Sequence, residues 1–281
     1  MDVGFIGLGN IGKPMAEHLV KAGLNTTVFD VMPEACESVV ELGACAAATP
    51  GEVAANADFI GVCVRNDDDV MSVLQGEEGI FANGRKGALV MIHSTVRQET
   101  ILQVAEMAKA HDMTVTDVPM TGGAGGAQAG TLCYMFGGSD ADLSKATPVL
   151  NTSADKIVHA GGTGAGIAMK LCNNLMTYAA FTAMHEAGKL AAASGLSFDV
   201  LKEVGQQNGV ITPQMLTFIE GRDALHEACS EEDFRGIFAG FAALGVKDLQ
   251  AALESAEQLG VSLPATEKHH ELIESVFFKA Y

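Results

Sequence analysis

The stretch VGFIGLGNIG, residues 3–12, joins a short apolar run to three glycines spaced as G-x-G-x-x-G. The run at 3–8 predicts a strand, and the amphipathic pattern at 11–23 predicts a helix directly after it. In this strand–turn–helix context the glycines indicate a dinucleotide-binding loop. The first glycine permits the tight turn, the second lets a pyrophosphate approach the backbone, and the third lets helix and strand pack closely. The alternative is a glycine-rich turn without a ligand.

If the loop binds a dinucleotide, the phosphates meet the free backbone N–H groups where the helix begins. The predicted cofactor-binding residues of the loop are Gly7, Leu8, Gly9, Asn10, Ile11 and Gly12.

Asp30 ends the second predicted strand, where a carboxylate would accept hydrogen bonds from the ribose hydroxyls of NAD. A 2′-phosphate would meet a like charge there, and Val31 and Met32 supply no arginine to attract it. The sequence therefore predicts NAD rather than NADP as the cofactor. The alternative is an ordinary turn aspartate before Pro33.

Apolar runs alternate with helical patterns up to about residue 160, and strand patterns stop after Gly164. The expected strands are 3–8, 26–30, 58–64, 87–93, 113–119 and 131–136, with helices at 11–23 and 97–111. Such alternation predicts a parallel sheet covered by helices on both faces. Later helices are expected at 167–194, 197–208, 213–222, 237–259 and 266–279. The expected fold class is α/β: a doubly wound Rossmann domain, 1–162, followed by an all-helical domain, 163–281, that begins with a long linking helix.

The overall composition limits the possible partners. The chain of 281 residues has 35 acidic and 17 basic residues, a net charge of −18, which opposes binding to nucleic acid or an anionic membrane. The start lacks a secretion-signal pattern, so we expect a cytoplasmic protein. The spacing of the six cysteines suggests neither zinc nor disulfides, and we expect no metal site.

A second glycine-rich motif, DVPMTGG at 117–123, also follows a predicted strand. Gly122 and Gly123 expose backbone N–H groups, and Thr121 adds a hydroxyl donor, a combination that suits a carboxylate. A flexible glycine-rich loop is the alternative.

Lys170 is the only Asp, Glu, Lys or Arg between Lys156 and Glu186. Its stem could pack while its ammonium reaches water. Alternatively, apolar surroundings lower the pKa of its ammonium toward the working range of a general acid or base. Asn174 follows one helical turn later on the same face, where it could hold a substrate or orient the ammonium.

Four stretches together resemble the β-hydroxyacid dehydrogenase family, which includes 3-hydroxyisobutyrate dehydrogenase and tartronate semialdehyde reductase. They are GLGNIGKPMA (7–16), DVPMTGGAGGAQAGTL (117–132), GTGAGIAMKLCNN (162–174) and LGVKDL (244–249). The resemblance spans nearly the whole chain. It implies a Rossmann domain joined by a long helix to a helical domain, and interconversion of 3-hydroxy acids and semialdehydes with NAD or NADP.

The resemblance also implies roles for individual residues. Lys170 matches the catalytic lysine. The positions that match substrate-binding residues are Thr121, Gly122, Gly123 and Asn174. The positions that match residues lining the cofactor are Val64, Arg65, Thr95 and Lys247.

Several positions depart from the family pattern. Thr121 replaces a serine, Ile92 stands where an aspartate is usual, and Arg65 replaces a proline. The stretch 205–216, expected near the substrate, matches no member. These departures leave the identity of the substrate open.

The leading hypothesis is an NAD-dependent oxidoreductase that interconverts a small 3-hydroxy acid and its semialdehyde or 3-oxo acid, with Lys170 as general acid and base. Its partner is a small carboxylate (or sulfonate) substrate. One alternative is an imine reductase of the same architecture, in which the lysine is usually replaced. Another is a non-catalytic dinucleotide-binding relative. Because the helix expected at 167–194 is apolar on most faces, we also expect a homodimer or homotetramer.

Overall fold

The computed structural model describes residues 1–279. The chain divides into two compact units, Met1–Lys170 and the residues from Leu171 onward, which are considered separately.

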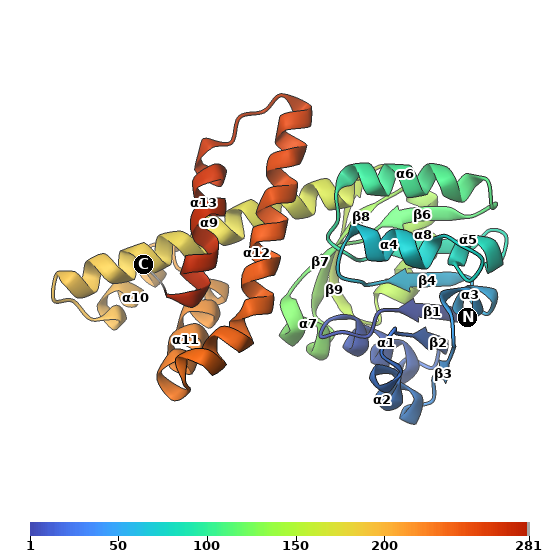
Figure 1. The fold of residues 1–281 in the computed structure, drawn as a ribbon, viewed down its shortest axis with the longest axis horizontal. Coiled ribbons are helices and arrows are strands. Elements are labelled where there is room, and N and C mark those ends of the chain that lie inside the picture. Colours follow the sequence, from blue (N-terminus) through green and yellow to red (C-terminus); the bar gives the residue numbers. More distant parts are fainter. Residues whose placement is uncertain (280–281) are drawn as a thin grey trace. The chain divides into compact units, whose positions relative to one another are not determined.

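The first unit is built on a nine-stranded sheet in the order β3-β2-β1-β4-β5-β6-β8-β7, with β9 paired to β8 (Figure 1). The strands are β1 (Asp2–Ile6), β2 (Asn25–Phe29), β3 (Cys45–Ala46), β4 (Phe59–Val62), β5 (Leu89–Ile92), β6 (Thr114–Asp117), β7 (Met120–Thr121), β8 (Leu132–Gly137) and β9 (Ala154–Gly161). The chain order reverses at β1, which lies between β2 and β4. This is the position at which doubly wound sheets bind their ligands.

The expected parallel sheet is confirmed over six strands, but one edge of the sheet contains antiparallel pairs. In the order in which they lie in the sheet, strands β3, β2, β1, β4, β5 and β6 are all parallel. Strand β8 runs antiparallel to both β6 and β7, and β9 is parallel to β8. The pattern also missed β3, β7 and β9. Two of these have only two residues, and the third, ADKIVHAG, contains an aspartate and a lysine and has no buried residue, so none presents an apolar run.

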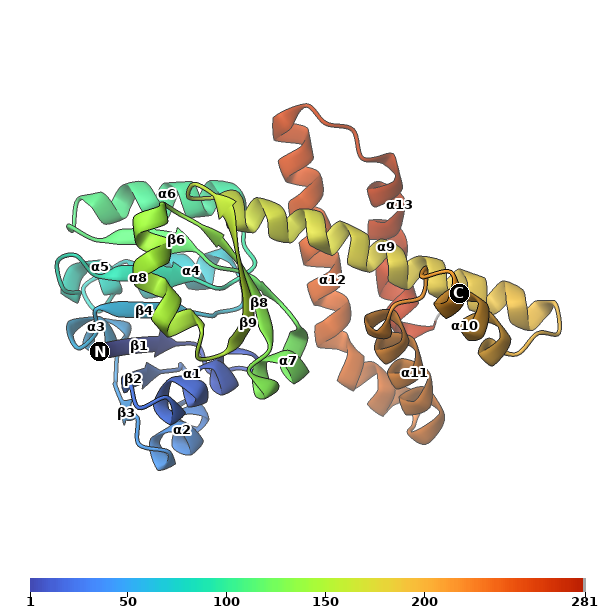
Figure 2. The ribbon, with the colours of Figure 1, turned by 180° about the vertical axis from the view of Figure 1, so that it is seen from behind.

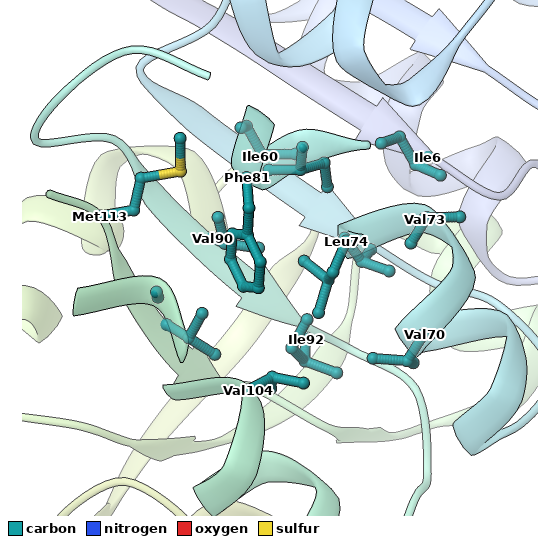
Figure 3. Packing of buried hydrophobic residues seen from close by; sticks show 14 of the residues in the cluster. Ile6, Ile60, Val70, Val73, Leu74, Phe81, Val90, Ile92, Val104 and Met113 are labelled. Carbon is teal, nitrogen blue, oxygen red and sulfur yellow. The ribbon is translucent and has the colours of Figure 1, made fainter. Parts of the chain in front are cut away.

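Helices cover both faces of the sheet, as expected. They are α1 (Gly12–Lys21), α2 (Glu37–Glu41), α3 (Pro50–Ala55), α4 (Asp67–Leu74), α5 (Ile80–Asn83), α6 (Gln98–Lys109), α7 (Gly123–Ala129) and α8 (Asp140–Leu150), with a short 3₁₀ turn at Pro33–Cys36. Alternate residues of each strand point to opposite faces. Val90 and Ile92 therefore pack under α3 to α6 (Figure 3), whereas Leu89 and Met91 pack in the core formed with α1, α2, α7 and α8.

Helix α9 (Ala165–Ala193) begins in the first unit and continues into the second. The second unit also contains α10 (Phe198–Gln207), α11 (Pro213–Ala228), α12 (Glu231–Leu259) and α13 (Pro264–Phe278), as Figures 1 and 2 show. Two predicted helices were too short. The end of α11 and the start of α12 consist largely of polar and acidic residues, which do not show the apolar periodicity of a helix. At the start of α12 the Ser230 side chain caps the helix by accepting the N–H of Asp233.

Aromatic side chains fill the core of the second unit. Phe181 stacks on Phe218 with ring centroids 3.9 Å apart, and Phe277 packs edge-on against both rings. Helices of the same chain thus bury part of the apolar surface of α9, whereas Met176 and Leu190 stay 67% and 71% exposed. By length and composition alone α12 could cross a membrane, a property it shares with core helices of soluble proteins.

Candidate functional site

The glycines of the first loop have three different environments. Gly7 has φ = +92°, and a side chain there would overlap the carbonyl of Cys63 at the end of β4. A side chain at Gly12 would overlap the carbonyl of Gly7. At Gly9, by contrast, an added Cβ meets no described atom within 4 Å. Gly7 and Gly12 therefore fold the loop, whereas Gly9 leaves its backbone open to a ligand.

Helix α1 begins at this loop with an uncapped N-terminus. Among the described residues, no side chain caps it, and its first turn holds no acidic residue. Two other helices of this unit differ, since Thr49 caps α3 and Asn66 caps α4, whereas α2 and α7 also lack a side-chain cap. The N–H groups and partial positive charge at the start of α1 are thus available to an anion.

The Asp30 carboxylate lies against the same loop. One oxygen accepts the N–H of Leu8 at 2.6 Å, and the other accepts the N–H of Met32 at 2.9 Å. These bonds hold a negative charge beside the glycine-rich loop, where the ribose next to a bound pyrophosphate would lie.

Hydrogen bonds join the loops that follow β4 and β5. The N–H of Val64 donates to Ser94 Oγ at 2.8 Å, one residue before Thr95. Asp67 accepts hydrogen bonds from the backbone of Arg97 and the hydroxyl of Thr100. Burial acts to raise the pKa of Asp67, but these bonds outweigh it, so its pKa is lowered. The two loops that carry the predicted cofactor residues are therefore held together.

Arg65 is mostly exposed and pairs with Asp69 through two hydrogen bonds of 2.8 and 3.2 Å. The ion pair and the field of Asp30 raise the pKa of its guanidinium. Arg65 thus adds a positive charge close to the glycine-rich loop at 7–12, at the position where the resemblance expects a proline.

The second glycine motif follows β6. Gly122 and Gly123 have φ values of +127° and +62°, so two successive residues adopt backbone conformations that favour glycine. Helix α7 starts at Gly123. Thr121 is half-buried on β7, and both glycines are exposed.

Lys170 lies beside this motif. Its Nζ donates a hydrogen bond of 2.7 Å to the backbone carbonyl of Met120, the residue before Thr121. The side chain is half-buried. An amine held at this carbonyl is placed next to the hydroxyl and backbone donors of the motif.

Sequence reasoning assigned no role to Asp117, which the structure places at the start of α9. Its side chain is 0% exposed. Its two oxygens accept the N–H groups of Gly164 at 2.6 Å and Ile167 at 2.7 Å. Burial raises the pKa of this carboxyl, although the backbone hydrogen bonds act in the opposite direction. The available signal was a single acid inside the apolar run MTVTDVPM.

In the second unit, a buried polar cluster surrounds Asn174. Its Nδ2 donates to the Asp248 carboxylate at 2.7 Å, and the Tyr178 hydroxyl donates to the same oxygen at 3.2 Å. Lys247 lies 3.5 Å from the other carboxylate oxygen. Burial raises the pKa of Tyr178, and the charge of Asp248 acts in the same direction, so the phenol stays a donor.

The structure brings most predicted site residues of the first unit to one edge of its sheet. Gly7, Asp30, Val64 and Thr95 follow β1, β2, β4 and β5, and the carboxyl ends of parallel strands share an edge. Two predicted residues, Asn174 and Lys247, belong to the second unit. Asp248 was not predicted as a site residue, although it is the acid next to Lys247.

Two family models match nearly the whole chain. The NAD-binding domain of 6-phosphogluconate dehydrogenase matches residues 2–162. The model described as NAD-binding of NADP-dependent 3-hydroxyisobutyrate dehydrogenase matches residues 164–279.

Individual relatives agree with these matches. A probable mitochondrial 3-hydroxyisobutyrate dehydrogenase of Dictyostelium discoideum is 38% identical, covering 96% of this chain and 84% of the relative. A 3-hydroxyisobutyrate dehydrogenase of Pseudomonas aeruginosa is 35% identical, covering 94% and 88%. A solved structure of Mycobacterium tuberculosis 3-hydroxyisobutyrate dehydrogenase with L-serine aligns over 99% of both chains, with a TM-score of 0.85 and 28% identity.

Proposed function

The chain belongs to the β-hydroxyacid dehydrogenase family and is a nicotinamide-dinucleotide-dependent oxidoreductase of hydroxy acids, and from this premise we propose a specific reaction. The protein interconverts a small 3-hydroxy acid and its semialdehyde or 3-oxo acid, uses NAD(H), and employs Lys170 as general acid and base. The observation that carries this proposal is the hydrogen bond from Lys170 Nζ to the carbonyl of Met120. It holds a titratable amine beside the donor-rich motif at 121–123.

The residues present fit a dinucleotide. Gly9 leaves open space at the loop, the start of α1 is uncapped, and Asp30 is fixed beside both. The predicted loop residues Asn10 and Ile11 would hold the phosphates through their backbone N–H groups, whereas Leu8, whose N–H donates to Asp30, would hold that carboxylate beside the ribose. The Asp30 carboxylate favours a free ribose hydroxyl over a 2′-phosphate. A bound nicotinamide would accept or supply the hydride of the reaction.

Lys170 handles the proton of that reaction. In oxidation, its neutral amine takes the proton of the substrate hydroxyl as the hydride leaves the same carbon. In reduction, its ammonium returns a proton to the carbonyl oxygen. The Met120 carbonyl accepts one of the amine's hydrogens, which fixes Nζ beside the motif at 121–123.

The substrate carboxylate is assigned to Thr121, Gly122 and Gly123, whose hydroxyl and backbone N–H groups donate to an anion. Asn174 provides a second contact. Since its Nδ2 donates to Asp248, its Oδ1, which accepts a hydrogen bond of 3.4 Å from Asn173 Nδ2, is the end whose second lone pair can accept from a hydroxyl or an ammonium. L-Serine, present in the M. tuberculosis structure, is itself a 3-hydroxy acid, which supports this substrate class.

We assign Val64, Arg65, Thr95 and Lys247 to the cofactor site and place the domain boundary at 162/163.

We further propose that the enzyme is a soluble homo-oligomer, because Met176 and Leu190 leave exposed apolar surface on α9. Light scattering that gives the mass of a single chain at micromolar concentration would contradict the oligomer.

An absorbance assay of NADH with a panel of substrates tests the reaction. The panel contains 3-hydroxy acids, the matching semialdehydes, a cyclic imine and a plain alcohol. We expect turnover of one or more 3-hydroxy acids. Lys170→Met should lower kcat roughly 10²–10⁴-fold, the usual contribution of a positioned acid or base. The matched control is Lys189→Met, at an exposed position of the same helix.

Two outcomes would overturn the proposal. Turnover of the imine alone would replace the hydroxy-acid assignment with imine reduction. Full turnover by a folded Lys170→Met protein would remove Lys170 from the mechanism.

A further inference from the structure

We infer that Asp117 is a positioning residue for Lys170: it fixes the start of α9 against β6, so that the amine one turn later lies at Met120. This inference rests on the proposed function of Lys170. Asp117 does not touch substrate, because its side chain is fully buried and both of its oxygens accept backbone N–H groups.

The contacts of Asp117 fix α9 at its first turn. The first N–H groups of a helix have no partner within the helix, and a carboxylate also interacts favourably with the positive end of the helix dipole. The two oxygens bind Gly164 and Ile167, which lie three residues apart around this turn. Such a two-point contact fixes both the rotation of the helix about its axis and its position along that axis.

Lys170 follows Ile167 by three residues, about one turn further along the helix. The amine of Lys170 then contacts Met120, which itself follows Asp117 by three residues. The segment 117–120 therefore holds the helix twice, once through a buried carboxylate and once through a carbonyl. A shift at the first contact moves the amine at the second.

Two glycines make room for the carboxylate. Gly137 is the register partner of Asp117 on β8, and a side chain there would overlap the carboxylate itself. An added Cβ at Gly166 of α9 would overlap the backbone carbonyl of Met135 on β8, and it would lie 2.8 Å from the backbone carbonyl of Asp117 and 2.9 Å from Asp117 Oδ2. The close approach of α9 to the strands thus depends on Gly166 as well as on the carboxylate.

Asp117→Asn is the variant that tests this role. An amide can accept one of the two N–H groups, but its own NH₂ then faces the other donor. We expect kcat to fall about 10–100-fold, because a misplacement of about 1 Å is enough for such a loss. The dissociation constant for NADH, measured by fluorescence titration, should stay within about twofold of the wild-type value, because the substitution does not touch the glycine-rich loop at 7–12. Asp155→Asn, at an exposed carboxylate, is the matched control.

A double-mutant cycle separates positioning from general damage to the fold. If Asp117 acts through Lys170, then Asp117→Asn lowers kcat in the wild-type background but has no further effect in the Lys170→Met background. Equal losses in both backgrounds would overturn the inference.

The chemical reactivity of the Lys170 amine can be measured without cofactor and without turnover. Reductive methylation followed by mass spectrometry gives the relative reaction rates of Lys170 and Lys156. Asp117→Asn should increase the rate at Lys170 several-fold and leave Lys156 unchanged, because the contact with Met120 is weakened. An unchanged ratio in a folded protein would overturn the inference.

Gly166→Ala provides a second variant in case Asp117→Asn does not fold. It should reproduce the loss of kcat and the faster methylation of Lys170. Gly162→Ala should change neither quantity, because an added Cβ there meets no described atom within 4 Å. If wild-type protein turns over no substrate in the panel, the proposed function fails, while the methylation experiment still decides whether Asp117 places Lys170.

Discussion

The amide of Asn174 is oriented by the buried carboxylate of Asp248, to which it donates a hydrogen bond of 2.7 Å. A carboxylate only accepts hydrogen bonds, so the nitrogen of the amide must face it and the oxygen must face away. The cluster thereby determines which atom of Asn174 is available for a substrate.

Asp248→Asn should weaken this control, because an amide at 248 permits Asn174 to turn either way. We expect kcat/KM to fall about tenfold or more, with the larger part in KM if Asn174 contacts the ground-state substrate. Tyr178→Phe removes the other hydrogen bond to Asp248 and leaves the Asn174 contact in place, so its effect on KM should be smaller. Steady-state kinetics of both variants, with urea unfolding as a control for stability, provides the measurement. A larger change in KM for Tyr178→Phe would contradict the assigned orientation.

Replacing Asp30 with Ala and Val31 with Arg should move cofactor preference from NAD toward NADP. The change removes the charge that repels a 2′-phosphate and adds one that attracts it. The ratio of kcat/KM for the two cofactors reports the change. If the wild-type enzyme already prefers NADP, the role assigned to Asp30 is wrong, and Arg65 becomes the group to test.

Thr121→Val keeps the shape of the side chain and removes its hydroxyl, so KM for the acid should rise more than kcat falls. The uncharged amide of the best substrate should be a poor substrate, because the donors at 121–123 would face a weaker acceptor. The net charge of −18 opposes an anion at long range, and salt screens this repulsion beyond about 10 Å at 0.1 M. We therefore expect kcat/KM for the acid to hold or rise with moderate salt. Equal turnover of acid and amide would remove the anion site from the proposal.

His93 should make the first unit sensitive to acid. Its Nδ1 hydrogen-bonds to the carbonyl of Val118, and burial lowers the pKa of its ring from 6.5 to about 4. The unfolded chain therefore binds a proton between these values while the folded protein does not, so stability falls as the pH drops from 6.5 toward 4. Between pH 7 and pH 5 this protonation lowers the free energy of unfolding by about 2 kcal/mol.

Urea unfolding of His93→Gln and of the wild type at pH 7 and pH 5 measures how much of this loss of unfolding free energy comes from His93. The variant loses ring packing against Phe5 and Tyr134 but should lose less stability on acidification than the wild type. His111→Gln, at an exposed histidine, is the matched control. Comparison with wild type also cancels the contribution of Asp117, which has the opposite sign because its pKa is raised in the folded state. An unchanged pH dependence in His93→Gln would show that His93 is not the responsible group.

The core of the Rossmann domain was predictable because its determinants are local. The glycines of the first loop act within a few residues of one another, and the buried strands β1, β4 and β5 are continuous apolar runs. The antiparallel edge was not predictable, because β7 is only two residues long and β9 has no buried residue. Pairing of such strands depends on the neighbours that the sheet supplies rather than on their own pattern.

The same distinction applies to the candidate site. Lys170 stood out as an isolated charge in an apolar helix. The roles of Asp117 and Asp248 depend on partners 47 to 74 positions away in the chain, and a single sequence does not reveal such partners. In both cases the acid itself was visible in the sequence, but what it holds in place was not.

The three glycines of the first loop have a consequence for the evolution of chains like this one. Gly7 and Gly12 are required by the fold itself, because a side chain at either would collide with backbone, whereas Gly9 borders open space. A descendant that abandoned its cofactor would stay under selection at two of these positions and be released from it at the third. Loss of Gly9 with retention of the other two would therefore mark a pseudoenzyme, and a partial motif is better evidence of common ancestry than of retained chemistry.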